Sequence, residues 1–266
     1  MSMSMRSRLK LPREHGAWAM LYVPFAVGAL VAWSAPLRLL LLALSVTFVF
    51  IARESLLIWW RARSRGQQND EALRFTLSYL ALAGMFGAPL LLVYHLYWFV
   101  AMGLAALVLL AISAGQAVRR EDRTIGGEMM AITGLTLTAP AAYYAARDTF
   151  DVTALWLWAL CAVYFASSVF YVKLRVNTIN PRMDEARRQT WRRCAFYHAF
   201  LFASLLVLAL TESLNLFAFA AFAPVLARSF WYLARPVRRI NLRRVGWLEI
   251  VYSVVFLIFM TLTFRF

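Results

Sequence analysis

Long apolar runs constrain this sequence more than any of its other features. Each run has roughly the 20 residues that an α-helix needs to cross a bilayer. The runs lie at residues 16–34, 38–60, 75–94, 97–117, 126–146, 153–173, 194–211, 213–233 and 246–264. Because lipid leaves no other partner for backbone groups, this pattern predicts an all-α, polytopic membrane helical bundle with about nine transmembrane helices.

The seventh and eighth runs are separated only by Thr211, Glu212 and Ser213. A single helix through both runs would have about 40 residues, which is twice the length that a bilayer requires. We therefore expect a tight helical hairpin at this point.

The composition agrees with a membrane protein. Of the 266 residues, 62% are hydrophobic and 15% are charged, whereas a soluble domain has about half apolar and a quarter charged residues. The net charge of +15 does not indicate nucleic-acid binding, because the sequence has no soluble basic face or known binding motif. We predict one membrane-embedded domain, residues 1–266, with membrane lipids and not nucleic acid as partners.

The basic residues predict the orientation of the chain. Of its 28 Lys and Arg residues, only Arg38, Arg147 and Arg265 fall in the segments expected outside, and Arg53 falls within a span. All the other Lys and Arg residues lie in the segments that alternate along the chain with these outer ones. Since basic loops stay in the cytoplasm, we expect the N-terminus to be cytoplasmic and the C-terminus to lie outside.

Ionisable side chains occur near the cytoplasmic ends of the predicted spans. Each would cost several kcal/mol in lipid unless it faced protein, water or a partner. We therefore expect a polar cavity open to the cytoplasm, lined by members of this set: Glu14, His15, Arg53, Glu54, Glu128, His198, Arg228 and Glu249. Alternatively, these residues only join helices, as Arg53 would if it paired with a carboxylate of another helix.

Two basic segments at the same level suggest anion binding. Arg119 and Arg123 precede Gly126 and Gly127, where the N-terminus of a helix can present backbone N–H groups to an anion. The glycines could instead allow close helix packing. Further along, Lys173 and Asn177 are one helical turn apart, a spacing that suits a phosphate, and Arg175 lies between them. These residues could instead be interfacial anchors.

The motifs of soluble enzymes are missing from this sequence. It contains no P-loop, GxSxG or HExxH motif. No metal-ligand set is predicted.

The PREHGAWAM segment at residues 12–20, followed by Pro24, resembles the opening signature of the YwiC-like family of bacterial membrane proteins. The Trp59-Trp60-Arg61 stretch and the segments 126–128 and 139–142 extend this resemblance. It implies a location in the bacterial cytoplasmic (inner) membrane.

The layout is more distantly similar to the UbiA superfamily of intramembrane prenyltransferases. That resemblance implies a UbiA-like architecture and a prenyl diphosphate held through Mg²⁺ by aspartate-rich motifs after the second and sixth spans. Here Asn69 and Asp70 are followed by Leu73 and Leu77, and cations follow the sixth span. The aspartate motifs therefore do not support Mg²⁺, and the cofactor stays unknown, but arginines can bind phosphate oxygens directly.

Together these observations predict a UbiA-like membrane protein that binds an isoprenoid or other lipid diphosphate, as a prenyltransferase without the usual aspartate motifs. The expected substrate-binding residues are Arg53, Arg61, Arg119, Arg123, Lys173, Arg175 and Asn177. The expected catalytic bases are Glu14, His15, Glu54 and Glu128. The alternatives are a transporter or lipid carrier, and a non-catalytic assembly or interaction subunit of a membrane complex.

Overall fold

The computed structural model describes residues 15–118, 124–179, 184–235 and 242–265. All regular elements in these ranges are helices, as the apolar runs predict. They are α1 (His15–Ala32), α2 (Pro36–Arg63), α3 (Asp70–Leu92), α4 (Trp98–Val118), α5 (Ile125–Thr136), α6 (Thr138–Arg147), α7 (Val152–Ile179), α8 (Asp184–Leu210), α9 (Leu216–Ala234) and α10 (Leu242–Arg265).

Seven of the described helices are long and apolar enough to cross a membrane, namely α2, α3, α4, α7, α8, α9 and α10. The helix α1 is apolar but shorter, and α5 and α6 together cover the fifth predicted run. Large apolar side chains such as Leu104, Leu210 and Phe196 are exposed on the outer helices, where lipid would cover them. The chain is a multi-pass membrane protein.

The fifth span is broken where α5 meets α6. Pro140 has no N–H to donate to the carbonyl of Thr136, four residues earlier, and Leu137 separates the two helices. The hydroxyl of Thr138 donates to the carbonyl of Leu21 on α1, at 2.7 Å. A side chain at the break thus ties α6 to α1.

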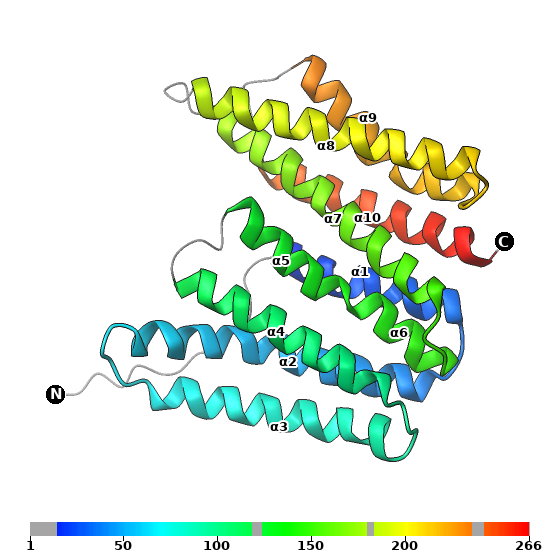
Figure 1. Cartoon of the computed structure of the whole chain (residues 1–266). Coiled ribbons are helices and arrows are strands. Elements are labelled where there is room, and N and C mark those ends of the chain that lie inside the picture. Colours follow the sequence, from blue (N-terminus) through cyan, green and yellow to red (C-terminus); the bar gives the residue numbers. More distant parts are fainter. Residues whose placement is uncertain (1–14, 119–123, 180–183, 236–241, 266) are drawn as a thin grey trace.

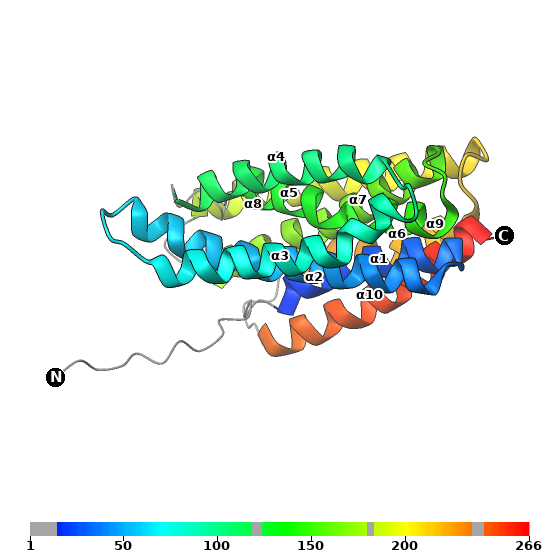
Figure 2. The ribbon, with the colours of Figure 1, turned by 90° about the horizontal axis from the view of Figure 1, so that it is seen from below.

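The helices form three groups. The centre contains α1, the α5–α6 pair, α7 and α10, with α2, α3 and α4 on one side and α8 and α9 on the other (Figure 1). Viewed from below, α1 and α10 lie side by side and run in the same direction (Figure 2). The helix α7 is central. Half of the residues in its most apolar stretch are buried, against 11% for α4.

The main core surrounds α7. The ring of Tyr164 stacks on Phe256 of α10 at 3.9 Å and meets Phe222 of α9 edge-on. A second cluster joins α2, α3, α4 and α6 and includes Leu42, Leu90 and Tyr144. Both clusters contribute residues to the wall of the cavity described below.

Three boundaries refine the sequence prediction. The helix α7 continues to Ile179 and α8 begins at Asp184, so both extend past their apolar runs. The predicted hairpin is confirmed, because α8 ends at Leu210 and α9 begins at Leu216. The helix α3 begins earlier than its apolar run, since the side chain of Asn69 accepts a hydrogen bond from the Ala72 N–H at 3.1 Å and caps the helix.

Candidate functional site

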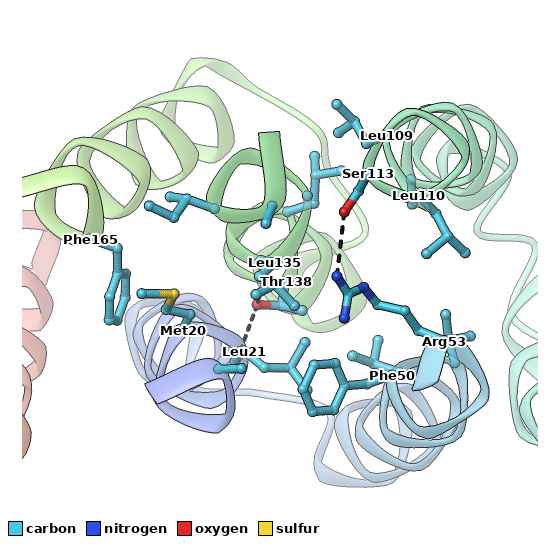
Figure 3. Close-up of a pocket in the computed structure, with 18 of the residues that line it drawn as sticks. Met20, Leu21, Phe50, Arg53, Leu109, Leu110, Ser113, Leu135, Thr138 and Phe165 are labelled. Carbon is cyan, nitrogen blue, oxygen red and sulfur yellow. Dashed lines mark hydrogen bonds between the residues drawn. The ribbon is translucent and has the colours of Figure 1, made fainter. Parts of the chain in front are cut away.

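A large cavity lies between the group of α2, α3 and α4 and the group of α1, α5, α6, α7 and α10. Its volume is about 2450 Å³. Leucine, phenylalanine and other apolar residues line its middle, as Leu109, Leu110, Leu135, Phe50 and Phe165 show (Figure 3). The charged residues on its wall all lie toward the end of the bundle where α2 ends and α5 begins. We call this the charged end, and it is lined by Arg53, Glu54, Arg61, Glu128, Lys173, Asn177 and Glu249.

Arg53 is the deepest of these charges on α2. At 1.5 Å per residue it lies about 15 Å before the end of the helix. Its guanidinium points from α2 into the space between the helices, toward α4 (Figure 3). It donates to Glu54 Oε1 at 2.8 Å and to Ser113 Oγ at 3.4 Å. The alternative that Arg53 pairs with a carboxylate of another helix is therefore wrong. Its carboxylate partner is Glu54, its neighbour on α2.

Glu128 and Lys173 form an ion pair between α5 and α7. Lys173 Nζ lies 3.0 Å from Glu128 Oε1, and the two side chains are 23% and 31% exposed for the lysine and the glutamate. The N-terminal cap of α5 fixes where the Glu128 carboxylate lies. Thr124 caps the helix by accepting a hydrogen bond from the Gly127 N–H at 3.1 Å. Both residues line the cavity.

Arg61 and Asn177 complete the polar wall near the mouth of the cavity. Arg61 donates to the carbonyl of Ala117 at 3.5 Å, which links α2 to α4. Asn177 donates to Thr190 Oγ1 at 2.9 Å, which links α7 to α8. Glu54 and Arg61 both line the cavity, as their shared helical face predicts.

A third ion pair, Arg228 with Glu249, joins α9 to α10. Glu249 Oε2 also accepts a hydrogen bond from Ser168 of α7 at 2.7 Å. The guanidinium carbon of Arg228 lies 3.9 Å from the centre of the Tyr171 ring, a cation–π contact. The sequence predicts both charges at this depth but does not pair them. Opposite charges at equal depth in consecutive spans are the signal that points to this pair.

His198 does not reach the cavity. Its side chain is fully buried between α7 and α8. Because a carbonyl can only accept, Nδ1 donates to the Cys194 carbonyl at 2.8 Å, and Nε2 is hydrogen-bonded to the Ser167 hydroxyl at 2.9 Å. Both ring nitrogens have partners, and the side chain joins α8 to α7.

The remaining predicted site residues fall into two groups. Arg175 does not line the cavity, because its guanidinium lies over the Tyr232 ring at 4.5 Å, on the side of α7 that faces α9. Its expected place beside Lys173 is thus corrected: neighbouring positions on a helix point in different directions. Glu14, Arg119, Arg123 and the His15 side chain lie outside the described residues. In the described ranges, no group of three or more His, Cys, Asp or Glu residues could hold a metal ion.

Comparison with known proteins gives a consistent picture. A family described as "YwiC-like protein" matches residues 11–143. The chain is 24% identical over 255 residues to an "Uncharacterized protein" of Haemophilus influenzae, covering 94% of this chain and 97% of that protein. It is 29% identical over 263 residues to the "Uncharacterized protein YwiC" of Bacillus subtilis, covering 95% of this chain and 97% of that protein. No solved structure matches the chain.

Proposed function

This chain belongs to the YwiC-like family. We propose that it binds a lipid phosphate, such as an isoprenoid diphosphate, in its cavity. The headgroup lies at the charged end and the tail lies in the apolar middle. One observation supports this proposal above all: a single cavity combines a long apolar wall with charges gathered at one end.

The size of the cavity favours an amphiphile over a small polar molecule. Pockets for drug-sized ligands measure roughly 300–1,000 Å³, whereas this cavity has about 2450 Å³. Its leucines and other apolar residues offer an acyl or prenyl tail surroundings as apolar as the bilayer itself. A soluble ligand would leave most of this apolar wall uncovered.

The pairing of Arg53 favours a binding role over a structural one. Its carboxylate partner, Glu54, is on the same helix, so this ion pair joins no two helices. A phosphate could replace Glu54 beside the guanidinium without separating α2 from its neighbours. Arginine presents five N–H donors in a planar fork, which suits bidentate binding of phosphate oxygens.

The enzymatic form of this proposal is prenyl transfer without the usual aspartate motifs. In this form the attacking group bonds to the prenyl carbon while the C–O bond to diphosphate breaks and diphosphate leaves. The proton of the attacking group passes to Glu54 or Glu128, which both line the cavity. Asn69, which would open the first aspartate motif, uses its side-chain oxygen to cap α3. The headgroup would therefore be held by Arg53, Arg61 and Lys173 directly.

We further propose that the protein resides in the bacterial inner membrane with its charged end toward the cytoplasm. Reporter domains fused after Arg65 or Arg188 are expected to give a cytoplasmic signal, and fusions at His95 or Asp148 an external one, because basic loops are retained inside. Activities of paired phosphatase and fluorescent-protein fusions measure this. Reversed signals at two or more sites would contradict the orientation.

Binding of a prenyl diphosphate is expected to survive chelation of Mg²⁺, because cations of the protein hold the headgroup. Arg61→Glu and Lys173→Glu should each weaken binding by about 2 kcal/mol or more, the scale of a charge-assisted hydrogen bond lost and a repulsion added. Binding to the purified chain is measured by displacement of a fluorescent prenyl diphosphate analogue, with and without EDTA.

Arg74→Glu provides the matched control, because Arg74 is exposed on α3 and does not line the cavity. It should leave the affinity unchanged. Absence of measurable affinity for prenyl diphosphates and other lipid phosphates, with or without metal, would refute the proposed function. Collapse of binding in EDTA would show that a metal holds the headgroup.

A lipid carrier is the second candidate, and the broken fifth span favours it. Leu137 and Thr138, at the junction of α5 and α6, both line the cavity, and interrupted helices at a central site are common in transporters. Movement of a fluorescent lipid phosphate between leaflets of proteoliposomes would support this candidate, whereas conversion of the lipid would support the enzyme.

A further inference from the structure

Glu249 differs from the other carboxylates of the cavity in where its basic partner lies. The two other ion pairs that the described residues form at the charged end have both partners on the cavity wall. Arg228 is absent from that wall, and its side chain is only 8% exposed. The rings of Tyr171 and Tyr252 lie over its guanidinium, at 3.9 and 5.2 Å from the centroids. The wall at this point therefore presents a negative group whose counter-ion lies behind it.

The carboxylate is also held in place. Arg228 donates to Oε1 and Ser168 donates to Oε2, so each oxygen has one partner from a different helix. An ionised carboxylate offers about four lone-pair positions, which leaves further acceptor capacity on the side that faces the cavity. The side chain is 22% exposed and lines the cavity. It is positioned to accept a hydrogen bond from a ligand.

We propose that Glu249 binds a protonated amine, so that the cavity takes an ammonium group beside a phosphate. This inference rests on the proposed function and narrows its ligand. A carboxylate repels phosphate but forms its strongest hydrogen bonds with charged donors. The basic residues Arg53 and Arg61 lie on α2, whereas Glu249 lies on α10, so a phosphate and an ammonium group would be held by different helices.

The ammonium group has two possible sources. It belongs either to the same lipid, as in a phosphoethanolamine headgroup, or to a separate small amine that binds beside a prenyl diphosphate. The chemistry at Glu249 is the same in both cases, and two arms of one experiment separate them.

In the first arm, the purified full-length chain is titrated with dioleoylphosphatidylethanolamine and with its N-acetyl derivative, which lacks the positive charge. The wild type should bind the amine form about tenfold more tightly, the ratio expected for one charge-assisted hydrogen bond. Glu249→Gln should reduce this ratio to about one. The control Glu71→Gln, at an exposed position of α3, should keep the ratio.

In the second arm, binding of a prenyl diphosphate is measured with and without ethanolamine. An increase in affinity with ethanolamine that disappears in Glu249→Gln assigns the amine to a separate molecule. Should Glu249→Gln fail to fold, Ser168→Ala is used instead, because it keeps the ion pair but releases Oε2 of Glu249. It should reduce the preference for the amine lipid, or the gain in affinity with ethanolamine, about threefold.

The outcomes distinguish the two proposals. Equal affinity for both lipids, together with no effect of ethanolamine, would overturn the amine site but leave phosphate binding intact. An amine preference that Glu249→Gln retains would overturn the assignment to Glu249. Failure to bind any of these phosphate lipids would remove the proposed function and this inference together.

Discussion

Gly28→Ala is expected to destabilise the protein by about 3 kcal/mol or more, at the upper end of the cost of overpacking a core. A Cβ at Gly28 would lie 2.1 Å from the Ala139 carbonyl oxygen and 3.0 Å from the Tyr143 backbone nitrogen. Both are backbone atoms of α6, so no side-chain rotation can relieve the contact. The helix α1 would have to move away from α6, against which it packs, and the Thr138 hydrogen bond to Leu21 would lengthen.

Thermal unfolding in detergent, followed by fluorescence-detected size-exclusion chromatography, measures this effect. Gly115→Ala is the matched control, because Gly115 is helical and a Cβ there meets nothing within 4 Å. It should be neutral or slightly stabilising, since glycine costs about 0.5–1 kcal/mol relative to alanine in a helix. A Gly28→Ala protein as stable as Gly115→Ala would show that α1 and α6 are not packed this closely.

The sequence predicts the helices well because lipid imposes a length and a polarity on each span. It predicts their ends less well. The polar ends of α7 and α8, beyond the apolar runs, pack through contacts such as Asn177 with Thr190, and no hydropathy pattern reveals such a contact. Pro140 accounts for the break at Leu137 because it removes a backbone donor. Proline alone does not predict a break, since Pro24, Pro89 and Pro224 lie within helices that continue.

The candidate site is predictable in depth but not in pairing. A charge within a span must find a partner or a cavity, which is why the sequence alone groups Arg53, Glu54, Glu128 and Lys173. All four line one cavity. Which carboxylate meets which cation depends on the rotation of each helix about its axis. Arg175 shows this, because it lies near Lys173 in sequence but faces α9 and the Tyr232 ring.

The remaining functional assignments stay predictions for a related reason. The apolar lining fits many tails. The charges of the wall cancel, because three basic and three acidic residues are among the described residues that line the cavity. A balanced wall does not by itself select a diphosphate over a zwitterionic headgroup. The distinction depends on which charges face the ligand, and this makes the Arg228 and Glu249 pair the most informative part of the site.

Removing the carboxylate of that pair is expected to cost more stability than any other single charge change at the cavity. Glu249→Met leaves the Arg228 guanidinium buried, at 8% exposure, without a counter-ion. Breaking a buried pair in this way costs about 3–5 kcal/mol, because an uncompensated charge remains in a low-dielectric setting. The contact of Arg228 with the Tyr171 ring is present before and after the change, so it does not offset this loss.

The double variant Arg228→Met/Glu249→Met tests whether the loss comes from the orphaned charge. Both charges are then absent and side chains of similar length fill the space, so most of the stability should return. A double-mutant cycle, with unfolding followed in mixed detergent and sodium dodecyl sulfate, should give a coupling energy of about 2–3 kcal/mol. Additive losses would show that Arg228 and Glu249 act independently. In that case Arg228 would not hold the carboxylate, and Ser168 alone would orient it toward the cavity.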